Sequence, residues 1–115
     1  MAAVTLLHNP RCSKSRQALA LLEAAGVTLT VRRYLDEPLS RAELLALHAK
    51  LDGPMVGWTR TKEAAFAGAG LTRDATDEAL LDAMVAHPIL MERPVAIAGD
   101  RAVVGRPPER VQELL

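Results

Sequence analysis

The chain lacks a second cysteine, and this absence restricts its chemistry more than any other feature. Cys12 is the one cysteine among 115 residues, so no disulfide bond can form within the chain. A lone cysteine is typical of proteins that work in a reducing compartment. The segment from Met1 to Leu7 also lacks the charged start and long apolar run of a secretory signal. We therefore expect a cytoplasmic protein.

Aromatic residues, an excess of one charge sign and long apolar runs are scarce too. Aromatics make up 3% of the chain while hydrophobic residues make up 50%, so the core must be aliphatic. Lys and Arg number 14, as do Asp and Glu, which leaves no global field to attract nucleic acid or a membrane surface. No apolar run approaches the roughly 20 residues needed to span a bilayer. With no aromatic hot-spot surface, we expect a monomer.

The pattern of apolar residues predicts one α/β domain over residues 1–115. Val4–Leu7 is a short apolar run before Asn-Pro, which favours a buried strand. Ser13 is a suitable cap for a helix that ends at Gly26, and alternation over 28–34 predicts a second strand. A strand, a helix and a strand within about 30 residues form a βαβ unit, which requires a parallel pair.

The rest of the chain is predicted to contain a helical insertion, a hairpin and a last helix. The insertion covers about 38–88, where strand signals are absent. Three helix starts occur there: the capping box of Ser40 and Glu43, Pro54 in a first turn, and Asp77 as an N-cap. Period-two residues return at 94–98 and 102–104 around a Gly-Asp turn, and a terminal helix follows. The order is β-α-β, insertion, β-β-α with a mixed sheet.

Cys12 lies between the first strand and the first helix, among basic and titratable neighbours. Residues 8–16 are His-Asn-Pro-Arg-Cys-Ser-Lys-Ser-Arg. Helix N-termini and nearby cations lower a cysteine pKa from about 8.5, and the thiolate is the nucleophile. A lone cysteine is more often a small buried hydrophobic residue. A strand-to-helix junction with this many charged residues, however, is not expected to lie in the hydrophobic core. We therefore favour a reactive thiol.

Three arginines are candidates for an oxyanion site beside this thiol. Guanidinium groups bind oxyanions through planar, bidentate contacts. Arg93 and Arg106 each precede a proline at a strand end, and the proline favours an extended conformation for the residue before it. Arg60 lies in the predicted insertion, where an isolated arginine is more simply a solvated surface charge.

The histidines give less information than the arginines. His8 either hydrogen-bonds the thiolate of Cys12 or is a satisfied histidine at a strand end, and spacing alone does not decide between these roles. His48 and His87 have no partner at the spacing of metal ligands. We expect no zinc or other metal site.

Three motifs in the chain belong together: His-Asn-Pro-Arg-Cys-Ser at 8–13, Met-Glu-Arg-Pro at 91–94 and Gly-Arg-Pro-Pro at 105–108. They resemble the signature of the glutaredoxin-coupled arsenate reductase family, which is related to Spx-type regulators. The resemblance runs nearly end to end and is greatest to a compact subgroup. It implies a thioredoxin-like fold with a helical insertion, in agreement with the predicted element order.

Carried onto this chain, the resemblance implies that Cys12 is the nucleophile and that His8 assists its thiolate. It implies that the substrate-binding residues are Arg60, Arg93, Arg106 and Ser15. It also implies a cis peptide bond before Pro94. The implied substrate is arsenate, with no bound cofactor, and the implied reductants are external glutathione and glutaredoxin.

Two other functions remain compatible with these residues. A Spx-type regulator would bind RNA polymerase through the same fold, although Ser15 stands where such proteins often carry a second cysteine. A monothiol oxidoreductase acting on glutathione mixed disulfides needs only one cysteine, although it gives no reason for three arginines. A phosphatase-type loop is set aside because Ala18 stands where that loop places its arginine.

Overall fold

A parallel strand pair begins the fold, as the βαβ pattern predicts. The computed structural model describes residues 3–51 and 53–115. In it, β1 (Ala3–His8) and β2 (Thr28–Arg33) pair in parallel, and His8 lies opposite Arg33 at their carboxyl ends. Side chains alternate along a strand, so His8 points to the same face of the sheet as the buried Leu6.

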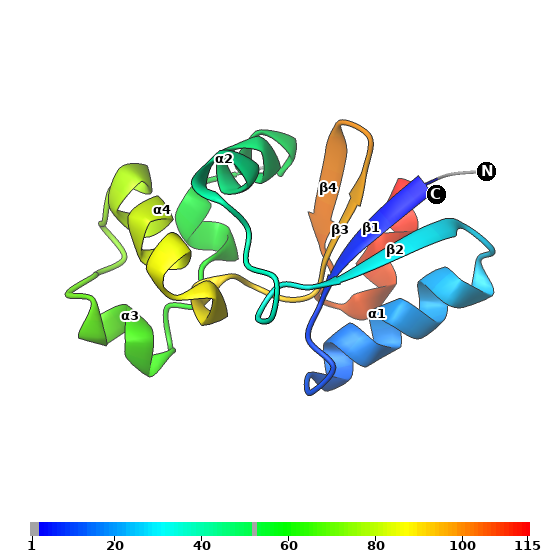
Figure 1. Ribbon diagram of the computed structural model, residues 1–115, viewed down its shortest axis with the longest axis horizontal. Coiled ribbons are helices and arrows are strands. Elements are labelled where there is room, and N and C mark those ends of the chain that lie inside the picture. The colour runs from blue at the N-terminus through cyan, green and yellow to red at the C-terminus, as the bar shows by residue number, and fades with distance from the viewer. Residues whose placement is uncertain (1–2, 52) are drawn as a thin grey trace. The chain divides into compact units, whose positions relative to one another are not determined.

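A hairpin completes a mixed four-stranded sheet of order β2-β1-β3-β4 (Figure 1). β3 (Val95–Ala98) is antiparallel both to β1 and to β4 (Arg101–Val104). Val95 pairs with Leu7 on one side and with Val104 on the other. The carboxyl ends of β1, β2 and β4 therefore meet the amino end of β3 at one edge of the sheet. This arrangement confirms the predicted α/β class.

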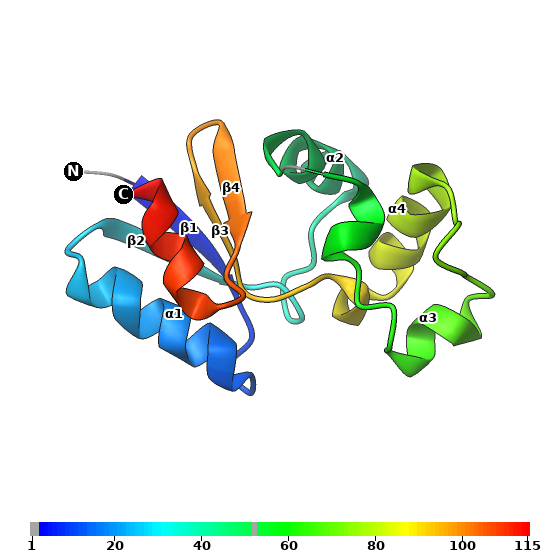
Figure 2. The same cartoon turned by 180° about the vertical axis from the view of Figure 1, so that it is seen from behind.

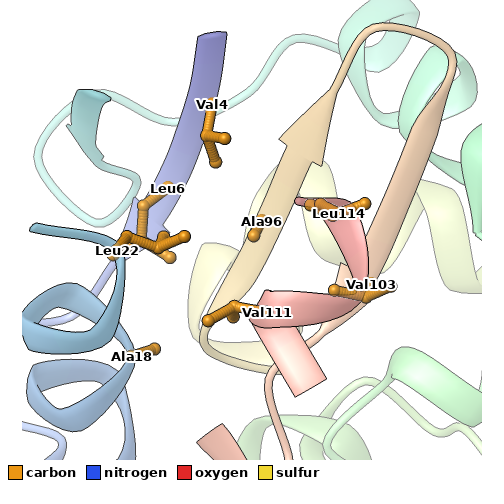
Figure 3. Packing of buried hydrophobic residues seen from close by; sticks show 8 residues of the cluster. All are labelled: Val4, Leu6, Ala18, Leu22, Ala96, Val103, Val111 and Leu114. Carbon is orange, nitrogen blue, oxygen red and sulfur yellow. The ribbon is translucent and has the colours of Figure 1, made fainter. Parts of the chain in front are cut away.

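Two helices cover one face of this sheet, as Figure 2 shows most clearly. They are α1 (Ser13–Ala24) and the short terminal 3-10 helix η3 (Pro108–Leu114). Their inner faces pack with residues of β1, β3 and β4 into one buried cluster (Figure 3), made of Val4, Leu6, Ala18, Leu22, Ala96, Val103, Val111 and Leu114. All of these side chains are aliphatic, as the composition predicts.

Two predicted helix caps are wrong by one residue. Cys12, in an extended conformation (φ −95°, ψ 123°), is the N-cap of α1, and Ser13 is the first helical residue. Thr76 caps α4 (Asp77–Ala86), and its hydroxyl accepts an N–H of the first turn. Asp77 instead lies inside that turn, where the helix dipole favours a carboxylate. At both helices capping propensity favours the predicted residue, but the structure places the cap one residue earlier.

Residues Pro38–Glu92 form a second compact unit, distinct from the unit of Met1–Glu37 and Arg93–Leu115. Besides α4, it contains α2 (Arg41–Lys50), η1 (Met55–Trp58), α3 (Ala64–Gly68) and η2 (Pro88–Leu90). α2 begins with the predicted capping box, in which Ser40 and Glu43 each accept the other's backbone N–H. Within 3–51 and 53–115, no helix is long and apolar enough to cross a membrane.

Two cis prolines lie at the edge of the sheet where the strand ends meet. The Arg93–Pro94 bond is cis, as expected, and so is Arg106–Pro107, which was not predicted. Gly105 N–H donates to Pro94 O at 2.8 Å. A Cβ at Gly105 would lie 2.8 Å from Pro94 Cγ and 3.0 Å from Val111 Cγ1. The packing of this edge therefore requires a glycine.

Replacing Gly105 with alanine should lower the free energy of unfolding by about 1–3 kcal/mol, because the rigid Pro94 ring cannot move aside without repacking. Urea unfolding measures this loss. Gly68→Ala is the matched control, because nothing lies within 4 Å of a Cβ at Gly68. Gly68 is helical, and alanine is the more favourable residue in a helix, so the free energy of unfolding should be unchanged or slightly higher. Equal stability of Gly105→Ala and the unmodified protein would contradict this account of the edge.

Candidate active site

Cys12 lies at the start of α1, directly after the chain leaves β1. The connecting turn is closed by Cys12 N–H, which donates to Asn9 O at 3.0 Å, and by Arg11 N–H, which donates to Asn9 Oδ1 at 3.0 Å. The helix begins at once, because Arg16 N–H donates to Cys12 O at 3.0 Å. Cys12 is partly exposed, so its thiol is accessible at a helix N-terminus.

Two of the predicted arginines, Arg93 and Arg106, belong to the same compact unit as this thiol and lie close to it. Arg93 precedes β3 and Arg106 follows β4, at the edge of the sheet where β1 ends. Arg106 Nη2 lies 3.7 Å from Cys12 Sγ, while its Nε donates to Arg93 O at 2.8 Å. The hydrogen bond from Nε orients the guanidinium group of Arg106, so that its Nη2 lies beside the sulfur.

The pKa of the Cys12 thiol is lowered by its surroundings. Burial is the largest influence and raises the pKa, since it disfavours the charged thiolate. The backbone N–H of Ser15, the charge of Arg93, the backbone N–H of Lys14 and the charge of Arg106 act in the opposite direction and together outweigh burial. Sγ makes no regular capping hydrogen bond with the helix, so these groups act by their orientation and charge around the sulfur.

His8 contacts Ser15, and in the described residues it makes no hydrogen bond to Cys12. His8 Nδ1 lies 2.7 Å from Ser15 Oγ, and Asn9 N–H donates to the same oxygen at 3.0 Å. Ser15 is fully buried and His8 nearly so. The hydroxyl therefore ties the end of β1 to the first turn of α1, the turn whose amides face the Cys12 sulfur.

The pKa of His8 is lowered, first by burial and then by the positive charges of Arg33 and Arg16. A neutral ring follows near pH 7. A neutral imidazole has one nitrogen that donates and one that accepts, and the Ser15 hydroxyl can pair with either. His8 thus influences the thiol through Ser15 and the helix start, which spacing along the sequence did not indicate.

Arg60 belongs to the unit Pro38–Glu92, and its described contacts are within that unit. Its Nη2 lies 2.5 Å from Glu63 Oε1, and its Nη1 donates to Ile89 O at 3.3 Å. Its role as a third oxyanion-binding arginine stays a prediction. No group of three or more His, Cys, Asp or Glu that could hold a metal ion occurs among residues 3–51 and 53–115.

Two further arginines lie around the Cys12 loop: Arg16, which the sequence placed among the basic neighbours of Cys12, and Arg33, which was not predicted. Arg16 Nη1 donates to Pro10 O at 3.0 Å, so its guanidinium folds back onto the loop that carries Cys12. Arg33 lies opposite His8 in the β1–β2 register. The signal for Arg33 was present in the predicted βαβ unit, because parallel strands end at the same edge of a sheet.

The fold and the site define an α/β protein with a mixed sheet and a single thiol at the N-terminus of its first helix. Residues 7–114 match the sequence model of the ArsC family. The chain belongs to the ArsC family.

Its relatives support this membership over the full length. The chain is 42% identical over 117 residues to an arsenate reductase of Neisseria meningitidis serogroup B, with 100% of both chains covered. It is 43% identical over 115 residues to the uncharacterized protein YfgD of Escherichia coli K12, covering 97% of this chain and 96% of that protein. The structure of an arsenate reductase from Vibrio cholerae matches with a TM-score of 0.94 at 40% identity, over 99% and 98% of the two chains. The fold is thioredoxin-like, as the resemblance implied.

The lowered pKa predicts that Cys12 reacts with iodoacetamide at a lower pH than free cysteine. The rate of alkylation should rise with a midpoint below about 8.5, and Arg93→Gln should move that midpoint upward because a stabilising charge is removed. Arg101→Gln, at the hairpin end of β4, is the matched control and should leave it in place. A midpoint at or above that of free cysteine would refute the electrostatic description of the site.

The lowered pKa of His8 predicts a loss of stability in acid. Because the folded protein disfavours the protonated ring, stability is complete above about pH 6.5 and falls as the pH drops through the folded pKa. His8→Asn keeps a side chain that can donate to or accept from the Ser15 hydroxyl, but it does not titrate. Urea unfolding between about pH 7.5 and 5 should show a smaller loss for His8→Asn; identical losses would contradict a buried, neutral His8.

Proposed function

We propose that this protein reduces arsenate to arsenite, with Cys12 as its nucleophile. The observation that carries the proposal is the guanidinium of Arg106, 3.7 Å from Cys12 Sγ at a helix N-terminus. A tetrahedral oxyanion suits this place, because guanidinium groups and helix amides both bind anionic oxygens. Relatives that match the whole chain are named arsenate reductases, which favours arsenate among such anions.

In the first step, arsenate binds with its oxygens on Arg93, Arg106 and the amides at the start of α1. The Cys12 thiolate attacks arsenic and forms a sulfur–arsenic bond. One arsenate oxygen takes up protons and leaves as water. Arsenic is still pentavalent in this adduct, so no electron has yet been transferred.

The second step needs a thiol from outside the chain. Reduction to the trivalent state takes a pair of electrons, which becomes available when the Cys12 sulfur joins a second sulfur in a disulfide. The incoming thiolate attacks Cys12 Sγ, the sulfur–arsenic bond breaks, and its electron pair stays on arsenic, which leaves as arsenite. With one cysteine in the chain, the second sulfur is external.

Glutathione is the thiol that we propose for this step, and glutaredoxin is the thiol protein that then regenerates Cys12. Both are present in a reducing compartment such as the cytoplasm, where they can reduce an enzyme that has a single cysteine. Glutaredoxin reduces the mixed disulfide between Cys12 and glutathione by thiol–disulfide exchange. The protein is thus proposed to work without a bound cofactor.

A coupled assay with arsenate, glutathione and glutaredoxin tests this function by following NADPH oxidation through glutathione reductase. Cys12→Ser should reduce turnover to background. Arg106→Gln should raise KM for arsenate about 10- to 100-fold, the value of a charge-assisted hydrogen bond, whereas Arg101→Gln should behave like the unmodified protein. Arsenate turnover by Cys12→Ser, or none by the unmodified protein, would overturn the proposal.

A further inference from the structure

Four exposed cations surround the Cys12 loop beyond the groups that contact the sulfur. They are Arg11, Lys14, Arg16 and Arg33, here called the cationic rim. In residues 3–51 and 53–115, none of the four forms an ion pair with an acidic side chain. Surface arginines elsewhere in the chain do form such pairs, as Arg110 does with Glu113 at 3.3 Å.

Independent contacts locate the rim around the loop that carries the thiol. Arg11 precedes Cys12 in the turn that leads into α1, and Lys14 lies in the first turn of that helix. Arg16 is held on this turn by its hydrogen bond to Pro10 O. Arg33 lies at the end of β2, opposite His8, and the charges of Arg33 and Arg16 both act on the His8 ring.

The rim opposes the charge preference of a helix start. The N-terminus of a helix carries partial positive charge and favours acidic residues. α2 and α4 follow this rule, with Glu43 in the first turn of α2, and Asp77 and Glu78 in that of α4. The first turn of α1 has no acidic residue and carries Lys14 and Arg16 instead. Helix stability therefore does not explain the two rim cations on α1.

The proposed oxyanion does not explain the rim either. Arg93 and Arg106 are partly buried and act on the sulfur, so they already supply the positive charge that the proposed oxyanion needs. The rim side chains are exposed around the loop instead. A second anionic reactant must approach the same sulfur during turnover. Glutathione fits the rim by its chemistry, because it carries carboxylates at both ends, a net negative charge and a thiol between them.

We propose that the cationic rim binds the carboxylates of glutathione and so delivers its thiol to Cys12. This inference rests on the proposed function, since it assigns the site of the thiol that resolves the adduct. It means that Cys12 selects anionic peptide thiols and disulfides over neutral ones of equal reactivity. Electrostatic selection of this kind weakens as added salt screens exposed charges.

A reaction without arsenate tests the rim by itself. The Cys12 thiolate attacks glutathione disulfide, forms the Cys12–glutathione mixed disulfide and releases one glutathione thiolate, which intact mass measurement follows in time. Neutral hydroxyethyl disulfide is the comparison reagent. The ratio of the two rate constants cancels any change in the nucleophilicity of Cys12 itself.

The double variant Lys14→Gln/Arg33→Gln is the informative one, because neither side chain makes a hydrogen bond or ion pair within the described residues. The ratio should fall about two- to fivefold for each charge removed, and the difference from the unmodified protein should shrink in about 0.5 M salt. Arg101→Gln/Arg110→Gln removes the same charge outside the rim and should leave the ratio unchanged.

An unchanged ratio in Lys14→Gln/Arg33→Gln, or an equal fall in the control pair, would overturn the assignment of the rim. Arsenate turnover in the coupled assay would then still stand. Conversely, the expected fall of the ratio in Lys14→Gln/Arg33→Gln, combined with no arsenate turnover by the unmodified protein, would overturn the proposed function. The protein would then be a thiol that selects glutathione. The two failures are therefore distinguishable.

Discussion

The buried hydroxyl of Ser15 is the constraint on which the rest of the site depends. It lies 2.7 Å from the His8 ring and 3.0 Å from Asn9 N, so it fastens the end of β1 to the first turn of α1. The turn that carries Cys12 connects the end of β1 to the first turn of α1, so holding these two segments together restricts its conformation. The amides of Lys14 and Ser15 therefore face the sulfur, and a histidine with no contact to the thiol still takes part in placing it.

Charge around the sulfur follows from the order of the strands. β1 ends, β3 begins and β4 ends at one edge of the sheet, so the two strand-flanking arginines arrive beside Cys12 from far along the chain. Burial alone would keep the thiol protonated. The guanidiniums and helix amides outweigh the effect of burial and lower the pKa of the thiol. The same groups are those that we propose to hold the anion, so one arrangement accounts for both the thiol and the proposed oxyanion site.

Hydrophobic periodicity and turn residues predicted the strands and the hairpin, because each of them depends on a local pattern. The parallel pair followed from the short strand–helix–strand order. The cap of α1 was misplaced at Ser13, since serine has the higher capping propensity and the turn at Asn9 that selects Cys12 is not visible in a pattern. The His8 partner was missed because Ser15 is seven residues away and across a turn. Arg93 and Arg106 were found as strand-end residues, but their approach to Cys12 requires antiparallel pairing, a non-local property.

Protection of Cys12 by phosphate tests most directly whether the thiol and the anion share one place. Phosphate is a tetrahedral oxyanion that thiols do not reduce, and iodoacetamide is neutral, so the two do not compete for charge. At constant ionic strength, phosphate should slow alkylation of Cys12 in a saturable manner, and Arg106→Gln should weaken this protection. Alkylation at the same rate at every phosphate concentration would contradict the account.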